Sequence, residues 1–210
     1  MDTVPDISVA LNAALTDLDI PDVTRDDVRC WVGNGARVLC GRAISRDSAD
    51  TADPALAEHL LEQFLRRYAE RTCAGSRIYD GAEPLLDWLA AHGIDLAIVT
   101  NKPFEHTGIL LEALALRRRF GLVIGGDSAL RKKPDPEPLR ECLRHYGLDP
   151  SDALMVGDSE NDIDAARAAG IDSVCVTYGY NQGRDVHGLG ANLVVESLPE
   201  LMQHLEPLTS

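Results

Sequence analysis

Three groups of polar residues in this sequence have the chemical types needed to bind a phosphate and a metal ion. They are residues 100–102 (TNK), 132–136 (KKPDP) and 157–162 (GDSEND), and each follows a short apolar segment. A threonine hydroxyl donates a hydrogen bond to a phosphoryl oxygen, and a lysine ammonium offsets the phosphoryl charge. Aspartate oxygens are ligands that Mg²⁺ prefers. Together the groups therefore suit a phosphate beside a divalent metal.

Each group also has a simpler explanation as local structure. A Thr-Asn pair after a strand is usually a turn or a helix cap, and Lys-Pro is common in loops. Asp158 and Ser159 have the types of N-cap residues. Taken singly, turns and caps explain the groups better. We favour a binding site because all three groups are expected at one edge of one sheet, beside a helix N-terminus that attracts anions.

The spacing of apolar residues predicts the elements that position these groups. Up to about residue 78 the spacing is helical, as in Ile7, Leu11 and Leu15, and Asp53-Pro54 is typical of a helix start. Beyond residue 80, short apolar strands alternate with helices, which indicates a parallel sheet covered on both faces. The predicted strands are 95–100, 122–124, 153–156, 173–177 and 193–195, and the predicted helices there are 84–91, 103–118, 136–146 and 161–169. In such sheets the ligand lies beyond the carboxyl ends of the strands.

The composition excludes some classes of partner. The chain has 210 residues with 34 acidic and 20 basic side chains, a net charge of −14. Nucleic acid and anionic membranes repel such a surface, but a local cationic pocket can still bind a phosphorylated molecule. No segment reaches the roughly 18 apolar residues of a membrane span, and the first residues do not resemble a secretory signal. We expect a cytoplasmic monomer or homodimer whose five scattered cysteines are reduced and form no zinc site.

The three groups resemble the second, third and fourth motifs of the haloacid dehalogenase superfamily of phosphatases. The matching stretches are LAIVTNK, KKPDPEPL and MVGDSENDIDAARAAG, and their order and spacing agree with the family. Within the superfamily, VPDISVALNAAL and WVGNGARVL look like phosphoglycolate phosphatases. The resemblance covers nearly the whole chain. It implies an α/β fold with a Rossmann-like parallel core, formed by residues 1–8 and 79–210, and an inserted helical cap at residues 9–78.

The resemblance also implies an activity, that of a phosphomonoester hydrolase that forms an aspartyl-phosphate with Mg²⁺. On the family pattern, Thr100 orients the phosphoryl group and Lys133 neutralises its charge. Lys132 is the rival lysine, but Lys133 directly precedes the Pro-x-Pro, as in the family motif. Asp158 is the implied Mg²⁺ ligand. The residues implied to support the metal shell are Ser159 and Asp162.

Two asparagines are candidates for substrate contacts. By the resemblance, Asn101 touches the phosphate through its backbone amide, and Asn34 lies where the family has a substrate-contacting cap loop. A plain turn explains Gly33-Asn34-Gly35 about equally well. The substrate implied is a small phosphorylated acid, 2-phosphoglycolate foremost, and a sugar phosphate is the enzymatic alternative because the cap decides that choice.

The family's first motif, Asp-x-Asp-x-Thr, has no counterpart in these 210 residues. In the family its first aspartate is the nucleophile and its second is the general acid/base. Asp2 and Asp6 are not substitutes, because by alignment they belong to the linker into the cap and its first helix. The family's missing strand is central, between the strands that end at Thr100 and Val156. With strands about 4.8 Å apart, we expect a gap of roughly 10 Å with unpaired backbone on both sides.

Two explanations of this difference stay open. We favour a misassigned start codon, with the nucleophile encoded upstream of Met1, because Thr100, Lys133 and Asp158 have no evident purpose without it. The alternative is a real truncation, which would leave an inactive relative that binds a phosphorylated ligand, a metal or a partner. A stop codon directly before Met1, with no in-frame Asp-x-Asp-x-Thr, would exclude the first explanation.

Overall fold

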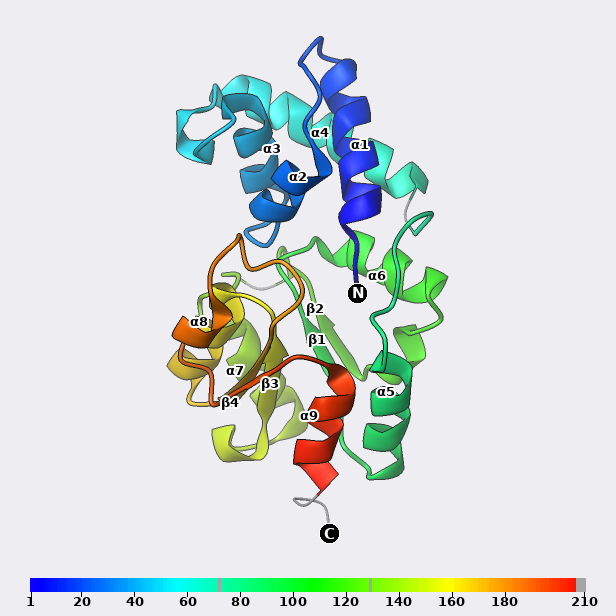
Figure 1. Cartoon of the computed structure of the whole chain (residues 1–210), viewed down its shortest axis with the longest axis vertical. Coiled ribbons are helices and arrows are strands. Elements are labelled where there is room, and N and C mark those ends of the chain that lie inside the picture. The colour runs from blue at the N-terminus through cyan, green and yellow to red at the C-terminus, as the bar shows by residue number, and fades with distance from the viewer. Residues whose placement is uncertain (72, 129, 207–210) are drawn as a thin grey trace.

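The computed structural model describes residues 1–71, 73–128 and 130–206, which form a helical part and an α/β part (Figure 1). The helical part comes first in the chain, as predicted. Its elements are α1 (Val4–Thr16), α2 (Arg25–Trp31), α3 (Ala36–Ser45), the 3₁₀ turn η1 (Ala49–Thr51) and α4 (Pro54–Arg71). Ser8, the last residue that the predicted division gives to the core, lies inside α1, so the division at this point stays a prediction.

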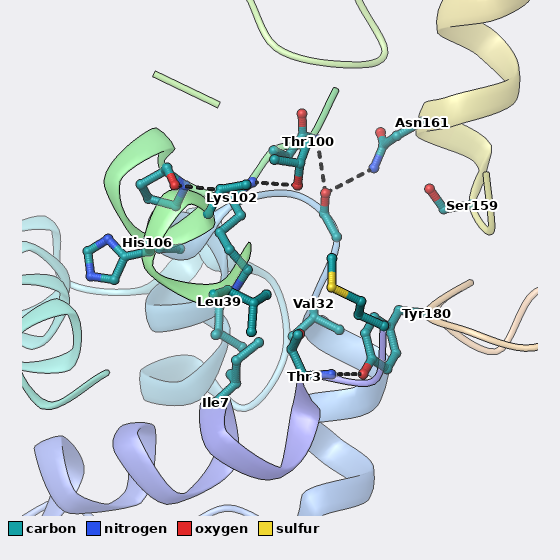
Figure 2. Close-up of a pocket in the computed structure, with 18 of the residues that line it drawn as sticks. Thr3, Ile7, Val32, Leu39, Thr100, Lys102, His106, Ser159, Asn161 and Tyr180 are labelled. Atoms are coloured by element: carbon teal, nitrogen blue, oxygen red, sulfur yellow. Dashed lines mark hydrogen bonds between the residues drawn. The ribbon is translucent and has the colours of Figure 1, made fainter. Parts of the chain in front are cut away.

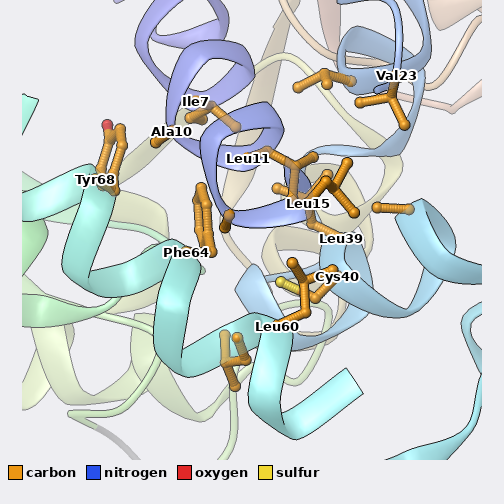
Figure 3. Close-up of a cluster of buried hydrophobic side chains, with 14 of the residues drawn as sticks. Ile7, Ala10, Leu11, Leu15, Val23, Leu39, Cys40, Leu60, Phe64 and Tyr68 are labelled. Carbon is orange, nitrogen blue, oxygen red and sulfur yellow. The ribbon is translucent and has the colours of Figure 1, made fainter. Parts of the chain in front are cut away.

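Helical spacing builds the core of the helical part. The apolar faces of α1, α3 and α4 meet in one buried cluster, in which Leu11, Leu60 and Phe64 are almost completely enclosed (Figure 3). The side chain of Asp53 accepts a hydrogen bond of 2.8 Å from the backbone N of Leu56 and so caps α4. The chain therefore enters α4 where the sequence predicts.

The α/β part alternates strands and helices as the sequence predicts. Its strands are β1 (Ala97–Val99), β2 (Leu122–Ile124), β3 (Leu154–Gly157), β4 (Asp172–Val176) and β5 (Leu193–Val195). Its α-helices are α5 (Ala82–Ala91), α6 (Phe104–Ala113), α7 (Glu137–Tyr146), α8 (Glu160–Ala169) and α9 (Leu198–Leu205), and its 3₁₀ turns are η2 (Arg117–Arg119), η3 (Pro150–Asp152) and η4 (Val186–Gly188). All described strand pairs are parallel.

Two elements differ from the prediction. The helix predicted at 103–118 ends at Ala113, because Ala115 has a positive φ of 56° that a helix cannot contain. Helix α9 was missed, although Ser197 caps it through a hydrogen bond from the backbone N of Glu200. Its short length gave a periodic signal too weak to separate from the chain end.

The strands form two sheets instead of one. One has the order β1-β2 and the other the order β3-β4-β5, and within the described ranges neither β1 nor β3 has a second strand partner. Val99 of β1 and Met155 of β3 nevertheless pack against one apolar cluster formed by α7 and α8. The two sheets therefore belong to one layer that is divided between β1 and β3. This is the division expected between the strands that end at Thr100 and Val156.

Exposed apolar side chains mark the same division. Strands of a parallel sheet covered on both faces are normally buried throughout. Leu154 and Val156 of β3 are 42% and 41% exposed, whereas Val174 of the neighbouring β4 is 3% exposed. Met155 lies on the face covered by α7 and α8, so alternation places Leu154 and Val156 on the opposite face. That face of β3 is open beside the gap.

A matched pair of substitutions tests the open edge. Val174→Ala removes buried methyl groups and should lower the free energy of unfolding by about 2–3 kcal/mol. Val156→Ala makes the same chemical change on a half-exposed side chain and should cost less than about 1 kcal/mol. Urea unfolding of both variants measures the difference. Equal losses would show that Val156 is covered.

Candidate active site

A cavity of about 270 Å³ lies between the helical part and the carboxyl ends of β1 and β3 (Figure 2). Both parts of the chain line it. The predicted site residues that it brings together are Thr100, Asn101, Lys133, Asp158, Ser159 and Asp162. Asn34 is not among its lining residues, although its neighbours Gly33 and Gly35 are. The convergence expected from the strand ends is therefore present in space.

Thr100 stands at the end of β1. Its backbone N donates to the carbonyl O of Ile124 at 3.0 Å, which extends the pairing of β1 and β2 by one residue. Its Oγ1 accepts a hydrogen bond of 3.2 Å from the backbone N of Lys102. Because this hydroxyl accepts in that bond, its own hydrogen can donate into the cavity.

A buried ion pair joins the loop before α7 to the start of α8. Lys133 Nζ lies 2.5 Å from Asp162 Oδ1, and both side chains are less than 10% exposed. Lys133 Nζ also donates to the carbonyl O of Val99 at 2.6 Å. Burial alone would raise the pKa of Asp162, but the charge and hydrogen bond of Lys133 hold that pKa below its usual value. The pair therefore holds the end of β1, the loop and α8 together.

Asp162 also caps α8. Its Oδ2 accepts hydrogen bonds from the backbone N of Asp158, the backbone N of Ser159 and the hydroxyl of Ser159, at 3.1, 3.1 and 2.7 Å. The anion attracted by this helix N-terminus is thus the protein's own carboxylate. Gly157 allows the close approach, because a Cβ there would lie 2.3 Å from Asp162 Cβ. The capping explanation for Ser159 is therefore correct locally.

Among the described residues, no cationic side chain forms an ion pair with the carboxylate of Asp158. Its Oδ2 accepts a hydrogen bond of 3.0 Å from the backbone N of Tyr180. Its pKa is raised, first by burial and then by the negative charge of Asp162, while Lys133 and the amino group of Met1 lower it by less. Gly179 makes room for it, since a Cβ there would lie 2.2 Å from Asp158 Oδ2. A cation beside this carboxylate would relieve its unfavourable burial.

The 33–35 loop joins the two parts of the chain by hydrogen bonds. The carbonyl O of Gly33 accepts from Asn101 Nδ2 at 2.9 Å and from Asn161 Nδ2 at 3.4 Å. The side-chain oxygen of Asn34 accepts from Gln182 Nε2 at 2.5 Å and from Asn161 Nδ2 at 3.2 Å. These bonds hold the 33–35 loop against the core beside the cavity.

The two neighbouring lysines of the third motif point to different places. Lys132 Nζ donates to the carbonyl O of Asn34 at 2.5 Å, so it contacts the 33–35 loop. Lys133 is the one inside the cavity, beside Asp162. Asn101 bridges both regions, because its Nδ2 also donates to the carbonyl O of Lys133 at 3.0 Å.

Asp2 and Asp6 hold the chain rather than face the reaction centre. Asp6 accepts hydrogen bonds from the backbone N atoms of Gly75 and Ser76, both at 2.7 Å. Asp2 accepts a hydrogen bond from the Tyr180 hydroxyl. Neither aspartate lines the cavity. Tyr180 was missed by sequence reasoning, because only the folded loop after β4 brings it to Asp158.

The residues of the cavity fit one part of a Mg²⁺ site. Asp158 offers a partly buried carboxylate whose pKa is raised by burial and by the charge of Asp162. Asp162 is already paired with Lys133. No cluster of three or more His, Cys, Asp or Glu side chains suitable for a metal occurs within residues 1–71, 73–128 and 130–206. Mg²⁺ often takes only one or two carboxylates and keeps several waters, so Asp158 is a fitting ligand that alone would bind it weakly.

We predict that Asp158→Asn stabilises the metal-free protein. The raised pKa means that the folded state binds more protons than the unfolded state just above the usual carboxyl pKa, so the ionised side chain lowers stability at neutral pH. With EDTA at pH 7.5 the variant should melt roughly 2–4 °C higher, the shift given by about 1 kcal/mol. The gain should shrink as the pH falls toward the usual carboxyl pKa, because the raised pKa lets the wild-type carboxyl take up its proton earlier. A lower melting temperature at pH 7.5 would contradict this assignment.

Comparison with known proteins assigns the chain to a family. The family model for haloacid dehalogenase-like hydrolases matches residues 1–176. The chain belongs to this family. None of the described helices is long and apolar enough to cross a membrane.

Individual relatives agree in function. The chain is 41% identical over 204 residues to a phosphoglycolate phosphatase of Pseudomonas putida, covering 96% of this chain and 74% of that protein. It is 39% identical over 208 residues to a phosphoglycolate phosphatase of Colwellia psychrerythraea, covering 98% and 92%. The fold matches the crystal structure of a predicted phosphoglycolate phosphatase from Haemophilus somnus with a TM-score of 0.90 at 33% identity, over 96% of this chain and 91% of that chain. Together, the family and these relatives identify the chain as a phosphatase.

Proposed function

We propose that this phosphatase is a Mg²⁺-dependent hydrolase of a small phosphorylated acid, with 2-phosphoglycolate as the first candidate, and that it acts through an aspartyl-phosphate. The observation that carries the proposal is the meeting of Thr100, Lys133 and Asp158 in one cavity. The names of the relatives point to the substrate. The cavity volume of about 270 Å³ suits a small molecule better than a drug-sized one.

Each residue of the cavity has its own role toward the phosphoryl group. The Thr100 hydroxyl donates a hydrogen bond to a phosphoryl oxygen and orients the group. Lys133 adds positive charge where negative charge gathers on that group, and Asp162 holds its ammonium in place. Asn101 supports both by fixing the 33–35 loop and the backbone of Lys133.

Mg²⁺ would be held by the carboxylate of Asp158. When bound, the ion supplies charge stabilisation at the phosphoryl oxygens. Asp162 accepts hydrogen bonds from the backbone N of both Asp158 and Ser159. Ser159 and Asp162 therefore fix the backbone that carries the metal ligand. Asp162 therefore positions the metal ligand and the phosphate-binding lysine at the same time.

The attacking carboxylate is proposed to come from one further parallel strand between β1 and β3. Among the described residues the carboxylates that line the cavity are Asp158 and Asp162, and Asp162 is committed to Lys133. Parallel strands end at the same edge of a sheet, so an aspartate at the end of the inserted strand would stand beside Thr100 and Asp158. The unpaired edges of β1 and β3 favour this insertion, because each would gain a row of backbone hydrogen bonds.

The helical part is proposed to act as the cap, with residues 9–78 as its sequence range. Its loop at 33–35 hydrogen-bonds to Asn101, Lys132 and Asn161 and closes the cavity from one side. Closure excludes water, which strengthens the electrostatic contacts inside. A cap in this position also contributes the wall that meets the non-reacting end of the substrate.

Phosphate release from 2-phosphoglycolate tests the proposal. We expect turnover by a form extended upstream of Met1 with the strand that bears Asp-x-Asp-x-Thr, and none by residues 1–210 alone. Turnover should stop when EDTA removes Mg²⁺, and Lys133→Met should lower kcat at least about 100-fold. Absence of turnover on 2-phosphoglycolate and on sugar phosphates by the extended form would reject it.

One structural observation favours a second function, that of a non-catalytic binding protein. Within the described chain, the carboxylates that line the cavity are Asp162, which is paired with Lys133, and Asp158, which we assign to the metal, so neither is left to attack a phosphoryl group. Titration with 2-phosphoglycolate, followed by ³¹P NMR, separates the two functions. Tight saturable binding without hydrolysis, by both the 210-residue and the extended form, would establish the binding protein instead of the enzyme.

A further inference from the structure

Lys102 also lines the cavity, and the chemistry proposed at Thr100 does not use it. Lys102 lies two residues after Thr100, and its side chain runs from there toward Leu39 and Ile7 of the helical part (Figure 2). Its Nζ donates to the hydroxyl of Tyr68 at 2.9 Å and lies 4.5 Å from the centre of the Tyr68 ring. The side chain thus reaches from the core into the cap.

Among the described residues, no carboxylate forms an ion pair with Lys102. Within the described residues no Asp or Glu side chain lies within 4.0 Å of its Nζ. The charge of Asp6 raises the pKa of Lys102, but the oxygens of Asp6 accept hydrogen bonds from Gly75 and Ser76. The other two lysines of the chain, Lys132 and Lys133, each meet a carbonyl or carboxylate oxygen at 2.5 Å. Lys102 is therefore a cation held in the cavity without an anion.

The surroundings of the ammonium are largely apolar. Leu39 and Ile7 form one wall, and the Tyr68 ring, which stacks with Phe64 and His106, forms another. Part of the side chain stays accessible because it borders the cavity, yet the surrounding protein removes most of its hydration. Burial lowers the pKa of Lys102 to about 8, although Asp6 opposes this shift. An anion at this point would recover much of the lost solvation.

We propose that Lys102 binds a carboxylate at the end of the substrate opposite the phosphoryl group, and so makes the enzyme select phosphorylated acids. The inference rests on the proposed function and names the residue behind its substrate class. One ammonium with one tyrosine hydroxyl matches the single charge of a carboxylate. No arginine lines the cavity among the described residues, so a second phosphate would lack the forked donors that suit it. The apolar walls would also leave sugar hydroxyls without partners.

A purely structural role is the competing explanation. Lys102 could serve only to link the core to Tyr68 through a hydrogen bond and a cation–π contact. The two roles differ in what Lys102→Met should do. A structural link predicts a loss of stability at every pH. An anion-binding cation that is unpaired without substrate predicts a variant at least as stable as wild type at pH 7.

Two substrates that differ only at the far end provide the decisive comparison. In 2-hydroxyethyl phosphate a neutral CH₂OH group replaces the carboxylate of 2-phosphoglycolate. For the extended wild-type form, we expect KM to be roughly 10- to 100-fold lower for 2-phosphoglycolate, the factor given by one hydrogen bond to a charged group. Lys102→Met should raise that KM by the same factor and leave KM for 2-hydroxyethyl phosphate and both kcat values nearly unchanged.

Controls separate this inference from the proposed function. Arg66→Met removes a cation from the exposed side of α4 and should change neither KM. Equal effects of Lys102→Met on both substrates would overturn the inference while phosphate release still supports the phosphatase. If neither compound is turned over, the proposed function fails. Calorimetric titration then still compares the affinities of the two compounds. Equal affinities in wild type and Lys102→Met would then overturn the carboxylate site.

The pH dependence of 1/KM distinguishes anion binding from a structural link, because a purely structural role of Lys102 would not change it. With the pKa of Lys102 near 8, 1/KM for 2-phosphoglycolate should fall above pH 8, and this limb should vanish in Lys102→Met. The titratable groups around Lys102 are Asp6 of α1, Tyr68 of α4 and, stacked on the Tyr68 ring, His106 of α6. Burial raises the pKa of Tyr68, so its hydroxyl stays neutral through this range. A limb at pH 8 that persists in Lys102→Met would overturn the assignment.

Discussion

The buried ion pair between Lys133 and Asp162 is the interaction on which the site depends. Taking both charges out of water is costly, and further hydrogen bonds made by both side chains offset part of that cost. Lys133 also binds the carbonyl of Val99, and Asp162 binds the backbone of Asp158 and Ser159. One pair therefore fixes the end of β1, the loop before α7 and the first turn of α8. It leaves Asp158 as the carboxylate turned to the cavity without a cation.

Two features beside the cavity are unfavourable in the described chain: the charge of Asp158 and the unpaired edges of β1 and β3. Asp158 has a raised pKa because its negative charge is buried beside another. The edges of β1 and β3 lack strand partners within the described chain, and Leu154 and Val156 are exposed where a covered sheet would bury them. A cation would correct the first defect and an inserted strand the second. Both corrections fall at the place where the phosphoryl group would lie, which links the folding of the sheet to the chemistry.

Much of this arrangement could be predicted from the residues alone. Alternating apolar segments indicate the parallel strands, and strand ends on one edge imply that Thr100, Lys133 and Asp158 meet, as they do. The direction of Lys102 could not be predicted, because it depends on Tyr68, which lies 34 positions away on a helix of the other part. Likewise, nothing local indicates that the Asn34 side chain bonds to Gln182, 148 positions away. Local patterns predict elements, whereas contacts between the two parts follow only from their packing.

Charge balance explains why each cation in the cavity matters. With histidine counted as neutral, the charged side chains of described residues that line the cavity are two lysines and two aspartates, which cancel. The surface of the protein is strongly acidic, but salt screens its field over about 8–10 Å, so attraction must come from inside the cavity. A phosphorylated acid adds about −1.5 to −2 from the phosphoryl group and −1 from the carboxylate. Two protein cations at opposite ends and a divalent ion at Asp158 would place positive charge beside each of these groups, and removing any one of them would leave a buried negative charge uncompensated.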